Sequence, residues 1–453
     1  MAGDEPPATT TLDAGDLEGL LADLRTAHAR FARSFAGDSA ERQPVHTVYG
    51  GAQLFRADSA PKIGALALKS LDQYAPDPTT FAAALGLPPT AELARLRARV
   101  VDKLTREPVE DYRIDFEDGY GHRPDAEEDA HSVSVAAEVA DGFRCGTLPP
   151  FIGIRIKPVS AELHRRSLRT LDLFVTALAR ALDGGFVPGF RVTIPKVVDA
   201  AQVAAVTAFC EALEGRLKLA ESSLRLEIMI ETPQSILDAE GRSPLRAMVD
   251  AGRGRVAGAH FGAYDYTALC GMTGPWQELR HPACDFARHL MQVALAQSGV
   301  HLSDSVTTTL PVPVHRRGAE PLTEAQQREN TGTVHRAWRL HFDNVRHSLI
   351  NGFYQGWDLH PAQLIPRYAA VYDFFDAARD AAAVRLRHFV AQATHATLAG
   401  SVFDDAATAQ GLLNFFVRGV NSGALTPAEA EQTGLTLDEL RARSFGKIIE
   451  RRR

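Results

Sequence analysis

The sequence has few of the features that mark several large protein classes. Its four cysteines, at positions 145, 210, 270 and 284, show no CxxC spacing, so we expect reduced, mostly buried thiols and no cysteine metal site. No uninterrupted apolar run approaches the length of about 20 residues that a membrane span needs. Residues 1–16 are acidic and rich in Pro and Thr, without the basic and apolar regions of a signal peptide. These absences predict a cytoplasmic protein with no membrane segment.

Basic stretches interleaved with aromatic residues are also missing. The formal charge is -7, which argues against a nucleic-acid partner. The chain has no GxGxxG motif after its first expected strand, which argues against the alternative of an open doubly wound sheet. Its 45% hydrophobic and 23% charged content is ordinary for a soluble globular enzyme. The 453 residues can hold a barrel of about 250 residues together with additions.

Strand-like and helix-like patterns alternate along most of the chain. Short segments of β-branched and aliphatic residues, separated by helical spacing, predict eight strands. An α/β (β/α)8 TIM barrel is the most economical fold, because its active site lies where the strands end. We expect an N-terminal helical extension over residues 1–44, the barrel over 45–366 and a C-terminal helical cap over 367–453 that closes over the barrel mouth. The expected strands are 45–51, 112–118, 151–158, 190–196, 224–233, 255–265, 300–307 and 352–359.

Two acids stand at the ends of neighbouring strands. Glu231 ends the apolar run 224–233, and Asp265 ends a second run about thirty residues later. A carboxylate at such a position needs a cation or hydrogen-bond donors. Two carboxylates with remaining positions for water and substrate oxygens suit Mg²⁺. The alternative is that each acid caps the helix that follows it.

A third strand end carries Asp115, Glu117 and Asp118. Asp115 and Glu117 lie on one face of the expected strand 112–118, where two like charges raise each other's pKa or recruit a cation. An exposed edge strand is the alternative. On the next strand, Arg155 is a buried guanidinium that needs a planar anionic partner, either a substrate or enolate oxygen or one of these acids in a structural ion pair.

Other polar residues at strand ends have weaker support. Lys196 is either an ion-pair partner or a Schiff-base lysine, and surrounding carboxylates favour the charged ammonium over the neutral amine. His260 and His360 stand near strand ends, where single histidines are usually structural. In the cap, Asp404 and Asp405 precede a helical pattern, so either acid alone is most simply a helix N-cap.

Six motifs in this order resemble those of the malate synthase and citrate lyase β-subunit superfamily. A further segment, Asp404-Asp-Ala-Ala-Thr-Ala409, resembles one in malate synthases whose aspartate is the catalytic base; the matching residue is Asp405. The six motifs, between about residues 110 and 370, are Asp115-Phe-Glu-Asp118, Ile154-Arg155-Ile156, Ile194-Pro-Lys-Val197, Met229-Ile-Glu-Thr-Pro233, Gly262-Ala-Tyr-Asp265 and Leu359-His-Pro-Ala-Gln363.

The resemblance implies a site for each of these residues. It implies Mg²⁺, with Mn²⁺ as an alternative, on Glu231 and Asp265, and water-mediated contacts to the ion from Asp115 and Glu117. It also implies catalytic roles for Arg155, beside a 2-oxo acid or an enolate oxygen, and for Asp405 as the base. We assign substrate binding to Arg155, Gly262, Ala263 and His360.

The function implied is that of a Mg²⁺-dependent carbon–carbon lyase or aldolase. It would form or cleave a bond through the enolate of a small 2-oxo or hydroxy acid, and a CoA thioester substrate remains open. Arg316-Arg317 is one candidate for binding the phosphates of such a thioester. The alternatives are a malate synthase-like condensation of an acyl-CoA with glyoxylate and a non-catalytic subunit that binds 2-oxo acids. We expect a homo-oligomer.

Overall fold

Eight parallel strands close into one barrel. The computed structural model describes residues 11–35, 37, 41–90, 92–316, 318, 320–394, 406–442 and 448. Each strand pairs with the next along the chain, and the last pairs with the first. All eight strands expected from the sequence are present, so the predicted (β/α)8 barrel is confirmed. They are β1 (His46–Gly51), β2 (Asp111–Asp115), β3 (Phe151–Arg155), β4 (Arg191–Ile194), β5 (Arg225–Ile230), β6 (Val256–Phe261), β7 (His301–Val306) and β8 (Gln355–Asp358).

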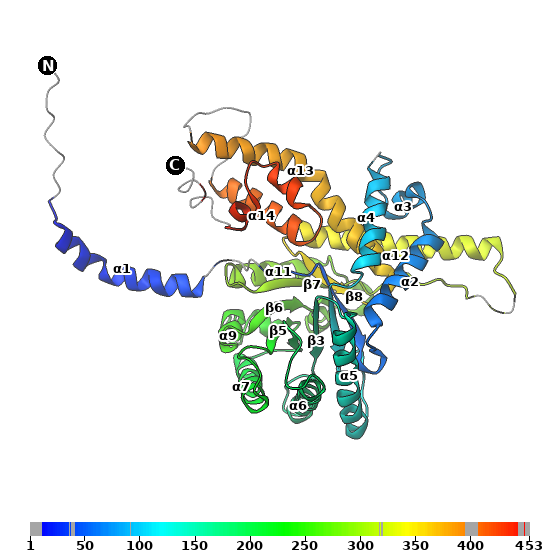
Figure 1. Cartoon of the computed structure of the whole chain (residues 1–453), viewed down its shortest axis with the longest axis horizontal. Helices are drawn as coiled ribbons and strands as arrows, with labels where there is room; N and C mark the ends of the chain where they lie inside the picture. Colours follow the sequence, from blue (N-terminus) through cyan, green and yellow to red (C-terminus); the bar gives the residue numbers. More distant parts are fainter. Residues whose placement is uncertain are drawn as a thin grey trace, which may run out of the picture.

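Helices follow the strands and surround the barrel (Figure 1). Apolar side chains on the outer face of the strands form the core between strands and helices, and Tyr112 of β2 packs there with its ring 5.2 Å from that of Phe55, in the segment between β1 and α2. The helices are α2 (Ser59–Tyr74), α3 (Pro78–Leu85), α4 (Leu93–Arg106), α5 (Asp125–Cys145), α6 (His164–Ala181), α7 (Ala200–Leu217), α8 (Pro233–Ile236), α9 (Leu245–Ala251), α10 (Ala263–Leu269), α11 (Pro282–Leu295), α12 (Glu324–Ile350) and α13 (Leu364–Thr394).

The structure differs from the sequence-based expectation after β5 and β6. The segment 224–233 was expected as one strand, but β5 ends at Ile230 and α8 begins at Pro233. A turn separates α8 from α9, and in it Asp238 accepts backbone N–H groups of Glu240 and Arg242. Gly241 has φ +73° there, a conformation that glycine adopts easily. After β6 the strand ends at Phe261, so Asp265 lies in the first turn of α10 rather than on the strand.

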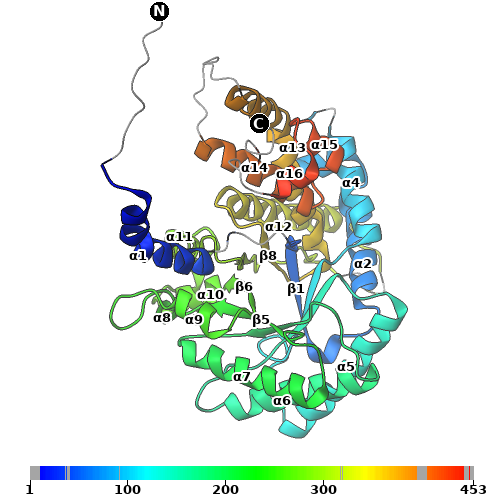
Figure 2. The same ribbon diagram turned by 60° about the vertical axis from the view of Figure 1, so that its left-hand side comes forward.

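The N-terminal extension and the C-terminal helices lie outside the barrel (Figure 2). The extension is α1 (Ala14–Ser34), and the described cap consists of α14 (Ala406–Asn421), α15 (Pro427–Glu431) and α16 (Leu437–Arg441). Among the described residues, no helix is both long and apolar enough to cross a bilayer.

The cap lies at the barrel end where the strands begin. Arg418 of α14 donates a hydrogen bond to Gln43, just before β1, and its guanidinium lies 5.0 Å from the ring of Tyr354, just before β8. Gln43 in turn donates to the backbone of Leu302 in β7. The expectation that the cap closes over the mouth of its own barrel is therefore wrong for the described helices, which lie at the opposite rim.

Candidate functional site

A cavity of about 350 Å³ opens where the strands end. One wall is polar and one is largely apolar and aromatic, so the cavity can hold a molecule with a charged end and an uncharged end. The polar wall includes Asp115, Asp118, Arg155, Glu231 and Asp265, and the other wall includes Tyr49, Tyr264, Val306, Trp357 and Leu359.

Arg155 and Asp115 form a buried ion pair at the base of the polar wall. Nε and Nη2 of Arg155 donate to the two carboxylate oxygens of Asp115 at 2.7 and 2.5 Å. Asp115 also accepts the backbone N–H groups of Glu117 and Gly119. Burial opposes the charge of Arg155, but Asp115 and Glu117 raise its pKa well above the ordinary value. The structural ion pair is therefore present, and Arg155 also lines the cavity; its contact with a substrate or enolate oxygen stays a prediction.

Lys196 projects its ammonium group into the same wall. The group pairs with Glu117 and lies 3.4 Å from Asp265 Oδ2. Burial lowers the pKa of Lys196, but the carboxylates of Glu231 and Glu117 outweigh it and raise that pKa above its ordinary value. A Schiff base requires the neutral amine, so this environment favours the ion-pair interpretation.

The backbone of Lys196 is held in the left-handed region, with φ +51°, which costs an L-residue about 1–2 kcal/mol. In this conformation its N–H donates to Glu231 Oε1 at 2.7 Å. The contact orients the carboxyl group of Glu231, so the strain serves the geometry of the polar wall.

Glu231 is buried and lies close to other acids. Its exposed fraction is 2%, and burial raises its pKa to about 8, with Lys196 and Arg155 opposing this shift and Asp265 adding to it. A Cβ at Gly262 would lie 2.4 Å from the Cβ of Glu231, so only glycine permits this packing. Thr232 caps α8, which excludes the alternative that Glu231 is that cap; Asp265 lies within the first turn of α10.

The charged residues at the end of the strands form a set that we call the mouth cluster, and in it carboxyl groups outnumber cations. Five acids face two cations, namely Asp115, Glu117, Asp118, Glu231 and Asp265 against Arg155 and Lys196. Within the described ranges, no group of three or more His, Cys, Asp or Glu side chains has metal-binding geometry. The donor set fits an ion held by two carboxylates with water and substrate oxygens in its remaining positions, as Mg²⁺ prefers.

A second charged set, the interior cluster, lies one layer deeper in the barrel. Nη2 of Arg113 donates to Asp111 at 2.7 Å and to Glu227 at 2.8 Å. Arg191 lies 3.3 Å from the other oxygen of Glu227. Thr47, Thr193 and His260 supply further polar contacts to these two acids. Two acids and two arginines therefore balance each other out of contact with solvent, and His260 belongs to this structural network.

The residues assigned to substrate binding differ in whether they line the cavity. Gly262 lines the cavity, but its N–H donates to the carbonyl of Ile230. The N–H of Ala263 donates to the hydroxyl of Ser305. His360 accepts the N–H of Ala362 through Nδ1 and caps a short 3-10 helix, Pro361–Gln363; it is not among the residues that line the cavity. Asp405, Asp404 and Arg317 lie outside the described residues.

Several cavity residues were not singled out from the sequence. Ser305, Val306 and Thr308 stand at the end of β7, and Trp357 and Leu359 at the end of β8. The sequence feature that could have identified them is their position at strand ends, because the ends of parallel strands in a barrel meet at one rim. Applying that rule to residues without charge would have found them.

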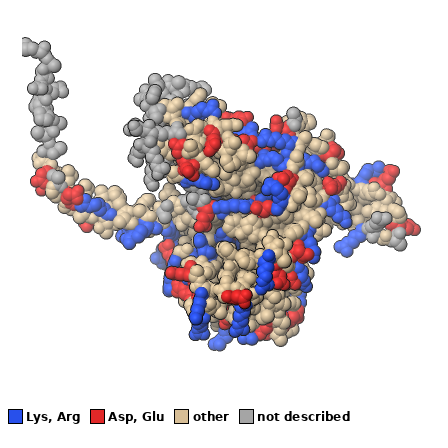
Figure 3. All heavy atoms as spheres, in the orientation of Figure 1, with Lys and Arg blue, Asp and Glu red and all other residues tan. Residues whose placement is uncertain are grey.

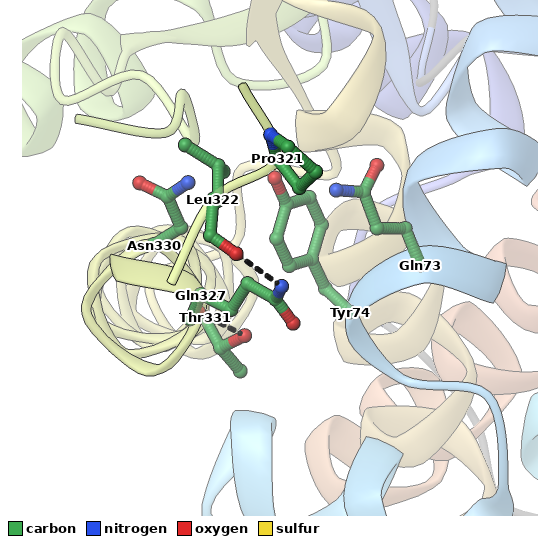
Figure 4. A pocket seen from close by; sticks show the side chains of 7 residues that line it. All are labelled: Gln73, Tyr74, Pro321, Leu322, Gln327, Asn330 and Thr331. Atoms are coloured by element: carbon green, nitrogen blue, oxygen red, sulfur yellow. Dashed lines mark hydrogen bonds between the residues drawn. The ribbon is translucent and has the colours of Figure 1, made fainter. Parts of the chain in front are cut away.

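Another cavity, of about 280 Å³, lies on the outside of the barrel between α2 and the start of α12. It is lined by uncharged residues (Figure 4), and the amide of Gln327 there donates to the carbonyl of Leu322. Among the described residues, its lining holds no Asp, Glu, His, Lys, Arg or Cys, so this cavity offers no charged set comparable to the mouth cluster.

Several solved structures are similar to this chain. A citrate lyase from Burkholderia xenovorans is 18% identical, with a TM-score of 0.55, and the match covers 87% of this chain and 97% of that chain. A malate synthase from Haloferax volcanii is 16% identical, with a TM-score of 0.45 and coverage of 91% and 98%. A HpcH/HpaI aldolase/citrate lyase family protein from Burkholderia cenocepacia is 12% identical, with a TM-score of 0.38 and coverage of 75% and 95%.

The similarity to the citrate lyase shows a shared fold, as the sequence motifs led us to expect. No curated protein sequence is significantly similar to this chain. The family model described as "Domain of unknown function (DUF6986)" matches residues 24–448. The chain belongs to this family.

Proposed function

We propose that the chain is a Mg²⁺-dependent carbon–carbon lyase or aldolase that acts on a small 2-oxo or hydroxy acid through an enolate. The observation that carries the proposal is the excess of acids over cations in the mouth cluster, beside a cavity of about 350 Å³. Glu231 and Asp265 would hold the ion. When bound, Mg²⁺ would supply positive charge that stabilises negative charge on the oxygens of the substrate.

Arg155 has the position for the second source of positive charge. Cleavage of the carbon–carbon bond leaves its electron pair as an enolate, whose oxygen needs a preorganised donor. Nη1 of Arg155 lies 3.1 Å from Glu117 and 3.8 Å from Asp118 on the cavity side. Asp115 holds the other guanidinium nitrogens, so the orientation of Nη1 is fixed before the substrate binds.

Lys196 keeps the polar wall ordered in this proposal. Its ammonium pairs with Glu117 and lies near Asp265, and its N–H orients Glu231. We assign it positioning and charge compensation, with no covalent role.

The proton transfer is assigned to Asp405, as the resemblance to malate synthases implies. In the cleavage direction the base takes the hydroxyl proton and then gives it to the carbon of the enolate. In the reverse direction it removes the proton beside the carbonyl and gives it to the alkoxide that the new bond leaves. None of the described cap residues lines the cavity. The proposal therefore assigns the base to a neighbouring copy, whose cap would reach this mouth.

Exchange of the protons beside the carbonyl of pyruvate into deuterated solvent, followed by NMR, tests the central proposal. We expect Mg²⁺-dependent exchange that falls by at least about 100-fold in Glu231→Gln and Asp265→Asn, because loss of either ligand removes the charge that stabilises the enolate. Glu240→Gln, at an exposed glutamate outside the cavity, is the matched control. Absence of Mg²⁺–oxalate binding by calorimetry, or undiminished exchange in both site variants, would refute the proposal.

Mixing two inactive proteins tests the origin of the base. Asp405→Asn and Glu231→Gln chains, unfolded and refolded together, should regain activity if one copy supplies the base and another the metal ligands. If Asp405 acts within its own chain, the mixture stays inactive. Release of free thiol from acetyl-CoA with glyoxylate would instead favour the condensing alternative.

A further inference from the structure

The helix α1 forms an arm that projects from the body of the protein (Figures 1 and 2). Large apolar side chains recur along it with helical spacing and remain exposed, including Leu20 at 69%, Leu24 at 47% and Phe31 at 58%. Leu17, Leu21 and Phe35 continue the same stripe, which occupies one face because residues three, four and seven apart lie above one another.

The arm is tied to the body at its C-terminal end. Arg246 of α9 donates to the carbonyl of Ser34, and its guanidinium lies 5.1 Å from the ring of Phe35. The N–H of Gly37 donates to the carbonyl of Gln297, which follows α11. Within the described part of the chain, the hydrogen bonds and ion pairs of residues 15–33 join this segment to α1 itself or to its caps. An apolar helical stripe of this length, left in water, calls for a covering surface, since most helical stability in proteins comes from packing an apolar face.

An uncovered apolar surface lies beside the foot of the arm. Phe286 and Val293, two turns apart on α11, are 52% and 78% exposed, and Ile350 at the end of α12 is 69% exposed. The side chain of Gln292 donates to the carbonyl of Asn351 and joins these two helices. We call Phe286, Val293 and Ile350 the α11 patch.

We propose that α1 is an exchange arm of a homodimer, in which the stripe of each copy packs on the α11 patch of the other. The foot of the arm is joined to Gln297, directly after α11, through the N–H of Gly37, and the arm runs away from the body (Figures 1 and 2). A two-fold axis near this foot would relate the two copies. The arm of each copy would then lie along α11 of the other, so that the same contact forms twice. An arm of 21 residues is about 30 Å long and about 10 Å wide.

The area is sufficient for a dimer. Each arm of that size covers about 300 Å² on each of two surfaces. Two exchanged arms therefore bury about 1,200 Å² in total, which reaches the lower end of stable interfaces.

Charge on the arm favours a protein partner over a membrane. The helix carries Asp16, Glu18 and Asp23 in its N-terminal half and Arg25, Arg30 and Arg33 in its C-terminal half, so acids and bases are equal in number along it (Figure 3). Helices that lie on anionic membranes carry an excess of Lys and Arg. The balanced arm lacks this excess.

Sedimentation of the full chain tests the exchange arm. Leu20→Glu with Leu24→Glu should weaken the dimer by at least about 100-fold, because apolar burial is lost in both arms. Ala22→Glu with Thr26→Glu, which adds the same charges at the same spacing on the opposite face, should leave the dimer intact. A wild-type chain that is monomeric at micromolar concentration, or equal behaviour of the two double variants, would overturn the proposal.

Cross-linking tests the surface that receives the arm. Chains carrying Leu24→Cys are mixed with chains carrying Val293→Cys under mild oxidation, and a disulfide between the two chains is expected. The matched mixture of Thr26→Cys with Val293→Cys should not cross-link. Cross-linking that is equal in both mixtures, or arm-dependent pelleting with anionic phosphatidylserine vesicles without a dimer, would contradict this assignment.

Discussion

The interior cluster and the mouth cluster occupy successive layers of one barrel and are built from the same residue types. In the interior, two acids and two arginines balance, and Arg113 holds the pKa of Glu227 well below its usual range despite burial. At the mouth, five acids face two cations, and burial raises the pKa of Glu231 to about 8. Asp118 and Asp265 are 65% and 41% exposed there, whereas the interior acids are buried.

The difference separates a structural network from a candidate site. A balanced, closed set of charges has no remaining demand for a ligand and holds the barrel together. An unbalanced set beside a cavity is stabilised when a cation binds, because the cation relieves repulsion between carboxylates. Charge balance and access to the cavity, rather than the number of acids, distinguish the two.

The largest expected effect comes from breaking the interior cluster. Arg113→Met leaves two buried carboxylates without their shared cation and should lower the free energy of unfolding by about 3–5 kcal/mol, measured by urea denaturation. Arg155→Met is the matched control one layer higher. It should cost less, since Asp115 keeps two backbone N–H donors. Equal losses would remove the distinction between the clusters.

Mg²⁺ should stabilise the folded protein through the mouth cluster and not through the interior cluster. At about 100 times its dissociation constant, Mg²⁺ should raise the free energy of unfolding by about 2.7 kcal/mol, and Asp265→Asn should lose most of this gain. Asp141→Asn, at an exposed aspartate on α5, should keep it. Thermal melts with and without Mg²⁺ measure the effect, and full stabilisation of Asp265→Asn would exclude Asp265 as a ligand.

The raised pKa of Glu231 gives the metal-free protein a distinctive pH dependence. In the folded state this carboxyl keeps its proton up to about pH 8, whereas its ordinary pKa is 4.5. Between these values the folded state binds more protons, so stability falls as pH rises, by at most about 1.4 kcal/mol per pH unit. In chelator, Glu231→Gln should lack this contribution. Parallel pH profiles for the two proteins would show that the pKa of Glu231 is not raised.

The smallest effect is expected at Lys196. Its side chain is 31% exposed, and water screens its ion pairs, so Lys196→Met should cost about 1 kcal/mol or less. Methionine has about the same energetic cost as lysine in the left-handed backbone conformation. The substitution therefore measures the contribution of the charge of Lys196. A loss in urea denaturation as large as that of Arg113→Met would show that the mouth is also a closed structural network.

The barrel and the convergence of its acids followed from the sequence because both depend on local patterns. The alternation at Arg113 and Asp115 sends both side chains inward, and strand ends in a parallel barrel share one rim. The break between α8 and α9 also had a local signal, in Asp238 and Gly241.

Other features depend on contacts between distant residues. The left-handed backbone of Lys196 is stabilised by an acid 35 positions later, and no local preference of lysine predicts it. The location of the cap rests on Arg418 and Gln43, which are 375 positions apart. Helical spacing identified α14 as a helix, but that spacing does not encode which rim of the barrel the helix contacts.

The seam between β1 and β8 has a consequence for synthesis. The ribosome makes β8 about 300 residues after β1, so at roughly 5–20 residues per second the first strand waits about 15–60 s for its last neighbour. During this time one edge of β1 is open to other nascent chains. The residues of β1 that later pair with β8 are His46, Thr47 and Val48, and Arg418 reaches Gln43 only later still. The pace of translation between β1 and β8 thus sets how long this edge of the nascent barrel stays open.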